Sequence, residues 1–140
     1  MADFLAPDVI VYVCTNCIPA GGHLRRQWKQ DGAQVLVREV PCSGKTDLQY
    51  LMHVVEGGGR GLCVVACPEG ECRLAQGNYR AEVRIRTLRR LLREIGVEPE
   101  RAELVRCSPD APAQELRELV DSVVSRISAL GPVRGLGIRD

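Results

Sequence analysis

The chain has 140 residues, of which 45% are hydrophobic and 26% charged, and its formal net charge is +1. These values are typical of one soluble globular domain that builds its core without disulfides, and they give no whole-molecule attraction to nucleic acid or to an anionic membrane. Aromatic residues make up only 4%, which argues against a base-stacking nucleic-acid surface, and no stretch is long and apolar enough for a membrane span.

The first half of the chain predicts two strands and two helices in alternation. Residues 9–13 are apolar and β-branched and predict a strand. Residues 23–30, with apolar residues four apart and Gly32 beyond them, predict a short helix, and residues 34–40 predict a second strand. A capping box that begins at Thr46 predicts the start of a helix with apolar residues at helical spacing, which a run of three glycines ends.

The second half continues the same alternation. Residues 61–66 are apolar on both faces, as expected of a central parallel strand. A long helix is predicted from Gly77 or Asn78 to Ile95, with Gly96 after its end and with Ile95 on its apolar stripe. Residues 102–107 predict a fourth strand, and residues 113–130 predict the last helix.

Strict βαβαβαβα alternation predicts an α/β fold, a doubly wound and mostly parallel four-stranded sheet of the flavodoxin-like or Rossmann-like type. We expect a single domain over residues 1–130 and a C-terminal tail or arm over residues 131–140, which hold three glycines and a proline. The first eight residues lack the pattern of a signal peptide, so the expected compartment is a reducing cytoplasm.

Five of the seven cysteines lie at or just beyond the ends of predicted strands. Cys14 and Cys17 follow the first strand, Cys42 follows the second, and Cys67 and Cys72 follow the third. The carboxyl ends of parallel strands meet at one edge of the sheet, so these thiols can come together in space. In a chain with no sign of secretion, such a group of thiols indicates a metal or an iron–sulfur centre.

Two other uses of these thiols compete with an iron–sulfur centre. Cys14 and Cys17 form a C-x-x-C pair, which thioredoxin-type thiol–disulfide proteins also use, but that chemistry leaves Cys42, Cys67 and Cys72 unexplained. Zinc takes four thiolates as a closed structural site, but structural zinc usually supports domains with poor cores. Placement at a functional sheet edge favours an iron–sulfur cluster, which also takes four thiolates.

The remaining features have both a structural and a functional interpretation. Cys63 lies inside an apolar strand and is expected in the core, whereas Cys107, at the end of the fourth predicted strand, lies either near the thiol site or apart from it. The long helix carries six arginines, which form either a solvated face or a docking surface for an acidic partner. No glycine-rich nucleotide fingerprint follows a strand.

The cysteine segments resemble motifs of a known family, the hydrogenase iron–sulfur subunit, or delta subunit of methyl-viologen-reducing (F420-non-reducing) hydrogenase. Its C-x-x-C-x-x-A-G and P-C-S-G motifs match residues 14–21 and 41–44, and its third cysteine motif matches residues 66–72. The segment Gly77–Ala81 and the stretch from Leu91 to Arg101 match later family motifs. The resemblance covers about residues 9–110, and the coincidence of these motifs in the same order is highly specific.

The resemblance implies a 2Fe–2S cluster bound by four of Cys14, Cys17, Cys42, Cys67 and Cys72, with the last three as the safest ligands. It also implies an electron-transfer subunit without catalysis of its own. Such a subunit passes electrons from a hydrogenase or another oxidoreductase to a heterodisulfide-reductase A-like subunit with flavin and iron–sulfur groups. Asn16, Pro68 and Arg73 depart from the family pattern, which bears on the cluster environment and the docking partner.

Overall fold

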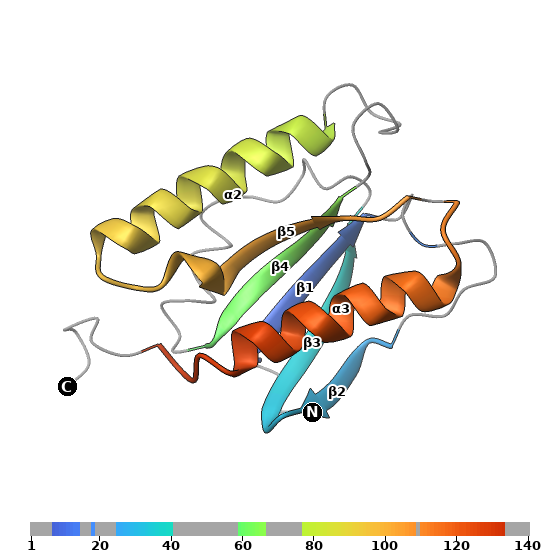
Figure 1. Ribbon diagram of the computed structural model, residues 1–140, viewed down its shortest axis with the longest axis horizontal. Helices are drawn as coiled ribbons and strands as arrows, with labels where there is room; N and C mark the ends of the chain where they lie inside the picture. Colours follow the sequence, from blue (N-terminus) through green and yellow to red (C-terminus); the bar gives the residue numbers. More distant parts are fainter. Residues whose placement is uncertain are drawn as a thin grey trace.

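In the computed structural model, two long helices pack on a twisted sheet (Figure 1). The structure describes residues 7–14, 18, 25–40, 59–66, 77–108 and 110–133. Within these residues the sheet has five strands in the order β2-β3-β1-β4-β5. The elements are β1 (Val9–Cys14), β2 (Gln27–Gln30), β3 (Ala33–Val40), β4 (Gly61–Ala66), α2 (Gly77–Glu94), a 3₁₀ helix (Pro99–Arg101), β5 (Ala102–Arg106) and α3 (Ala113–Ser128).

Four parallel strands form the main part of the sheet, as the sequence predicts. β1 pairs with β3 on one side and with β4 on the other, and β4 pairs with β5. Every residue of β1 and of β4 is buried, which explains why both strands are apolar on both faces. The order β3-β1-β4-β5 follows the first four positions of the flavodoxin-like order, but β2 adds a fifth strand, so the predicted count of four strands is wrong.

The two helices cover opposite faces of the sheet. On one face, Val11 and Val13 of β1 pack with Val120 and Val124 of α3. On the other face, Tyr12 belongs to a cluster with residues of α2, among them Leu88 and Leu92. Alternate residues of β1 therefore supply two separate cores, because successive side chains of a strand point to opposite faces.

The predicted helix over residues 23–30 is wrong in its described part. Residues 27–30 form β2, which pairs antiparallel with β3 and adds a fifth strand at the edge of the sheet. The hairpin turn is Asp31–Gly32, and both residues have positive φ, 52° and 78°. A two-residue Asp-Gly loop with φ above zero at both positions matches the twist of a β-hairpin, so the turn chemistry overrides the weak helical spacing.

The other described elements lie close to their predicted bounds. α2 ends at Glu94, and Gly96 has φ +82°, as expected of the residue that ends a helix. Ile95 is 48% exposed rather than part of the apolar stripe, because the helix ends one residue before it. The helix predicted from Thr46 lies outside the described residues. None of the described helices is long and apolar enough to cross a bilayer.

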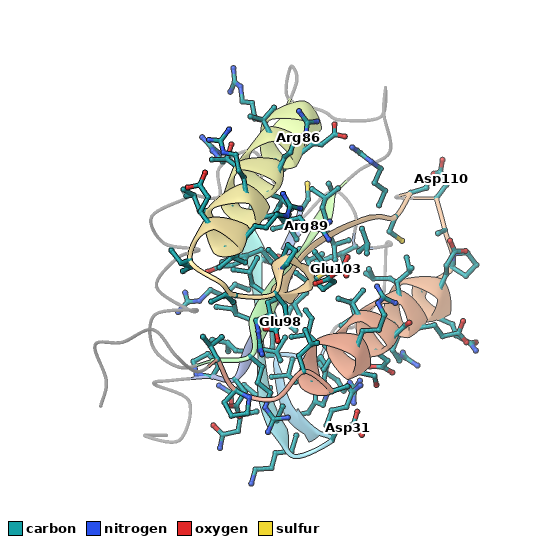
Figure 2. The ribbon with its side chains drawn as sticks, turned by 60° about the vertical axis from the view of Figure 1, so that its left-hand side comes forward. Asp31, Arg86, Arg89, Glu98, Glu103 and Asp110 are labelled. Atoms are coloured by element: carbon teal, nitrogen blue, oxygen red, sulfur yellow. The ribbon has the colours of Figure 1, made fainter. Side chains whose placement is uncertain are left out.

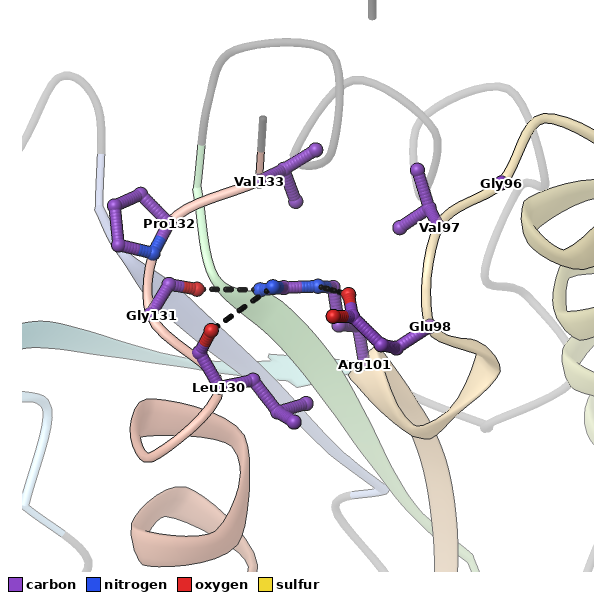
Figure 3. Close-up of a pocket in the computed structure, with 8 residues that line it drawn as sticks. All are labelled: Gly96, Val97, Glu98, Arg101, Leu130, Gly131, Pro132 and Val133. Atoms are coloured by element: carbon purple, nitrogen blue, oxygen red, sulfur yellow. Dashed lines mark hydrogen bonds and ion pairs between the residues drawn. The ribbon is translucent and has the colours of Figure 1, made fainter. Parts of the chain in front are cut away.

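The amino-terminal edge of the sheet is held by one buried arginine (Figure 3). The Arg101 guanidinium is 3% exposed and donates to a carboxylate oxygen of Glu98 at 2.7 Å. It also donates to the carbonyl oxygens of Arg60 at 2.9 Å, Leu130 at 3.1 Å and Gly131. The hydrogen bond from Arg101 holds the pKa of the Glu98 carboxyl below its usual value. Arg101 therefore ties the end of α3 to the start of β4.

The first residues of the predicted tail pack on the domain. Val133 is 3% exposed and belongs to the core under α2, and its amide donates to the Gly59 carbonyl at 3.3 Å. Arg101, Pro132 and Val133 help to line a cavity of about 340 Å³ between this segment and the loop after α2 (Figure 3).

Candidate metal centre

The carboxyl edge of the sheet is where the predicted thiol segments begin. β3, β1 and β4 are neighbours and parallel, and they end at Val40, Cys14 and Ala66. Cys14 pairs in register with Val40. The chain places β3 on one side of β1 and β4 on the other, so the topological switch point lies between β1 and β4, where open α/β sheets bind their ligands.

Among the predicted cluster ligands, the structure describes Cys14. This residue is the last of β1, is 3% exposed and packs at the end of the core under α3. Cys17, Cys42, Cys67 and Cys72 lie outside the described residues. In the sequence, Cys42 comes two positions after the end of β3, and Cys67 directly follows β4.

The donor chemistry at this edge suits a soft metal or a metal–sulfide group. A buried cysteine at a switch point supplies sulfur, the donor that iron–sulfur clusters take. The described residues do not complete a site, since no three of their His, Cys, Asp or Glu side chains are grouped to hold a metal ion. The other donors would have to come from the segments that follow β1, β3 and β4.

Cys107 lies at the same edge of the sheet. It directly follows β5, is 2% exposed, and its amide donates to the Ala66 carbonyl at 2.9 Å. Its Sγ lies 3.8 Å from the carbonyl oxygen of Ser108, to which the thiol donates. Cys107 is therefore placed beside the end of β4, at the edge where the predicted thiol segments begin.

The charges at this edge favour an anionic group. α2 begins there, close to the ends of β4 and β5 (Figure 1), and its first turn holds no acidic residue to offset the partial positive charge of a helix start. Arg106, at the end of β5, forms an ion pair with Glu82 of α2 at 3.3 Å. A cluster held by four thiolates is negatively charged, so the helix start is a favourable neighbour for it.

A polar network fastens the β2 hairpin to α3. The side-chain amide of Gln30 donates to the Asp121 carbonyl and to the Ser125 hydroxyl, each at 2.9 Å. The Trp28 indole donates to the Gln30 side-chain oxygen at 2.9 Å, and Arg25 stacks over the Trp28 ring at 4.0 Å. Arg25 also pairs with Asp121 at 2.7 Å. The network holds Arg25 and the β2 hairpin against α3.

The sequence reasoning missed this hairpin and its network. The Asp31–Gly32 dipeptide directly before an apolar, β-branched segment was the available signal, because Asp-Gly favours a two-residue hairpin turn. No sequence signal marks Gln30 as the residue that bridges to α3, since that contact spans 91 positions.

Cys63 lies in the core, as predicted. It is fully buried in the middle of β4 and belongs to the core under α3. Burial is the main cause that raises the pKa of the Cys63 thiol, from 9.0 to about 12; the nearby Glu103 carboxylate contributes to this rise and Arg126 opposes it. A thiol that stays protonated at neutral pH is a poor ligand and a poor nucleophile.

We expect Cys63 to resist alkylation at pH 8 in the folded protein, because the thiol is both protonated and inaccessible. Mass spectrometry after iodoacetamide treatment, with and without denaturant, measures this. Below pH 9 the Cys63 thiol is protonated in both the folded and the unfolded protein. Between about pH 9 and 12 only the folded protein keeps this proton, so the free energy of unfolding falls by about 1.4 kcal/mol per pH unit as the pH rises. Modification of Cys63 in the folded protein would contradict its placement.

Comparison with known proteins identifies the family. Residues 9–131 match the family described as "Methyl-viologen-reducing hydrogenase, delta subunit". The chain is 30% identical to an iron–sulfur subunit of the F420-non-reducing hydrogenase of Archaeoglobus profundus, over 96% of this chain and 98% of that protein. It is 33% identical to the vhu iron–sulfur subunit of the F420-non-reducing hydrogenase of Methanocaldococcus jannaschii, over 90% and 94% of the two chains.

A second kind of relative contains a similar region inside a much longer protein. This relative is the A subunit of the ferredoxin/F420H2-dependent CoB-CoM heterodisulfide reductase of Methanosarcina acetivorans, and the match covers 91% of this chain but 16% of that protein, at 23% identity. The family match covers nearly the whole chain, and the full-length relatives agree with it. The chain therefore belongs to the family of the delta subunit of methyl-viologen-reducing hydrogenase, the hydrogenase iron–sulfur subunit family.

Proposed function

We propose that the chain is an electron-transfer subunit with one 2Fe–2S cluster at the carboxyl edge of its sheet. Four of Cys14, Cys17, Cys42, Cys67 and Cys72 would hold the cluster. The observation that carries this proposal is the adjacency of β3, β1 and β4, which end where the cysteine segments begin. The names of the full-length relatives, which are iron–sulfur subunits, support the same type of group.

In this proposal the chain catalyses no reaction alone. A bound 2Fe–2S cluster supplies one-electron transfer. The chain's own part is to bind and orient the group: β1 fixes Cys14 in a buried position, and the start of α2 supplies positive potential. Dry surroundings and positive potential both act on the reduction potential of an iron–sulfur group.

The burial of Cys14 disfavours the thioredoxin-type alternative. In such proteins the attacking thiol is accessible and lies at the start of a helix, where its pKa falls. Cys14 instead ends a strand and is 3% exposed. A buried strand-end cysteine is better suited to hold a group than to attack a disulfide.

The proposed acceptor is a heterodisulfide-reductase A-like subunit with flavin and iron–sulfur groups. The support is the relative in which a region similar to this chain is part of the long A subunit of a heterodisulfide reductase. A domain that is covalently joined to a partner in one protein is expected to work beside that partner when it is separate. The proposed donor is a hydrogenase or another oxidoreductase, and the proposed compartment is the cytoplasm.

Purification of the tagged chain without oxygen from the organism that makes it tests this function. We expect a flavoprotein similar to the heterodisulfide-reductase A protein to co-purify, and we expect the reduced chain to pass electrons to its flavin, which absorbance at the flavin band follows. An oxygen-stable monomer that neither binds nor reduces such a flavoprotein would contradict the proposal.

A further inference from the structure

Helix α2 carries a stripe of exposed arginines on its outer side. Arg86, Arg90 and Arg93 are all exposed and lie at i, i+4 and i+7, a spacing that places them on one side of a helix. We call these three residues the arginine stripe. Arg89 lies on another side of the helix, nearer β5, and donates to the Pro99 carbonyl at 3.2 Å (Figure 2).

Little within the described residues neutralises the arginine stripe. Arg86 lies 3.7 Å from Glu82, which makes a closer pair with Arg106 at 3.3 Å. Arg90 and Arg93 form no ion pair with any residue of the described ranges. Like charges at i,i+4 destabilise a helix, so the stripe weakens α2 in the isolated chain. An anionic partner would remove this repulsion.

The charge is concentrated on this helix and not on the chain as a whole. α2 holds six arginines and two glutamates, whereas the net charge of the chain is +1. Arginine is enriched in protein–protein interfaces and among the residues that contribute most to binding there.

We propose that the arginine stripe docks an acidic surface of a protein partner, whose Asp and Glu side chains pair with the three arginines. A nucleic acid or an anionic membrane fits less well, since the chain has almost no net charge. The proposal rests on the proposed function in one respect: the acidic partner is a subunit of the electron-transfer assembly to which this chain would belong.

The position of the stripe separates docking from electron transfer. α2 starts at the carboxyl edge and runs toward the opposite edge of the sheet (Figure 1). Arg86 and Arg93 are nine and sixteen positions into the helix, roughly 13 and 24 Å along its axis from Gly77. The stripe therefore anchors a partner at a distance from the thiol edge, and changes there are expected to leave the cluster unaltered.

Charge reversal in the whole assembly tests the proposal. Arg90→Glu is compared with Arg117→Glu, a matched exposed arginine on α3, with each tagged variant isolated without oxygen from the producing organism. We expect Arg90→Glu to weaken retention of one partner protein about tenfold, more strongly at low salt, and Arg117→Glu to change it less than about twofold. Equal retention in both variants would overturn the proposal.

A second variant identifies the partner's chemistry. Arg90→Lys keeps the charge and adds an amine to a chain that has only Lys29 and Lys45, so carbodiimide coupling reports which carboxylate touches position 90. We expect wild-type retention and a cross-link to an Asp or Glu of a partner protein. A cross-link only within this chain, or retention that nuclease treatment or phosphatidylglycerol vesicles abolish, would overturn the proposal. An unchanged cluster spectrum with altered retention separates this result from failure of the proposed function.

Discussion

Replacement of Cys42, Cys67 or Cys72 by serine is expected to remove the 2Fe–2S cluster or to leave well under half of it. A hydroxyl is a poor ligand for iron where a soft thiolate is needed, and each of these cysteines follows a strand that ends at the carboxyl edge. Iron and sulfide per chain, measured on variants purified without oxygen, give the result. Cys14→Ser and Cys17→Ser are expected to differ, since five cysteines share four ligand positions.

Cys63→Ala is the matched control, because Cys63 is buried in the middle of β4 and its thiol stays protonated. It is expected to keep the full cluster, as is Cys107→Ala. Loss of the cluster in Cys63→Ala together with its retention in Cys67→Ser would show that the third strand presents a different cysteine to the site.

Arg101→Met is expected to lower the unfolding free energy by about 3–5 kcal/mol. The guanidinium is 3% exposed and donates to three part-buried backbone carbonyls, and a carbonyl left without a donor costs roughly 1–3 kcal/mol when it is fully buried and less when water can reach it. Glu98 adds less, because its side chain is 52% exposed and water can replace the arginine. Urea unfolding followed by circular dichroism measures the change.

Arg117→Met, on the exposed side of α3, is the control and is expected to change stability by less than about 0.5 kcal/mol. Loss of Arg101 is also expected to speed hydrogen exchange at the Val133 amide and to return the pKa of Glu98 toward its usual value. Because the pKa of Glu98 is lower in the folded than in the unfolded protein, ionised Glu98 stabilises the wild type at pH values above its unfolded-state pKa. This contribution is lost as the pH falls through the folded-state pKa. Equal stability of Arg101→Met and the wild type would contradict the role of Arg101.

The parallel strands were predictable because their burial dictates their composition. β1 and β4 are buried on both faces, so only apolar and β-branched residues serve there, and the sequence displays them directly. The β2 hairpin was not predicted, since apolar residues four apart suggested a helix and the decisive signal was the Asp31–Gly32 turn. The spacing of two apolar residues is weak evidence for a helix where a hairpin turn and pairing with β3 both favour a strand.

Contacts between side chains and segments far away in the sequence could not be predicted from the sequence. Arg101 is buried only because carbonyls near residues 60 and 130 meet at its position, and arginine is otherwise a surface residue. Ile95 fitted the helical spacing of a core residue, but α2 ends before it. For the thiols, the sequence placed Cys14 at the end of a strand and Cys63 in the core, and the structure confirms both. The other proposed ligands stay predictions.

The most direct test of the central claim is iron and sulfide analysis of the protein purified without oxygen, with an EPR spectrum of the reduced form. A brown protein with about two iron and two sulfide per chain, and a reduced signal of one unpaired electron, is the predicted result. A colourless preparation, whether loaded with zinc or free of metal, would contradict the assignment of this chain as an iron–sulfur electron-transfer subunit.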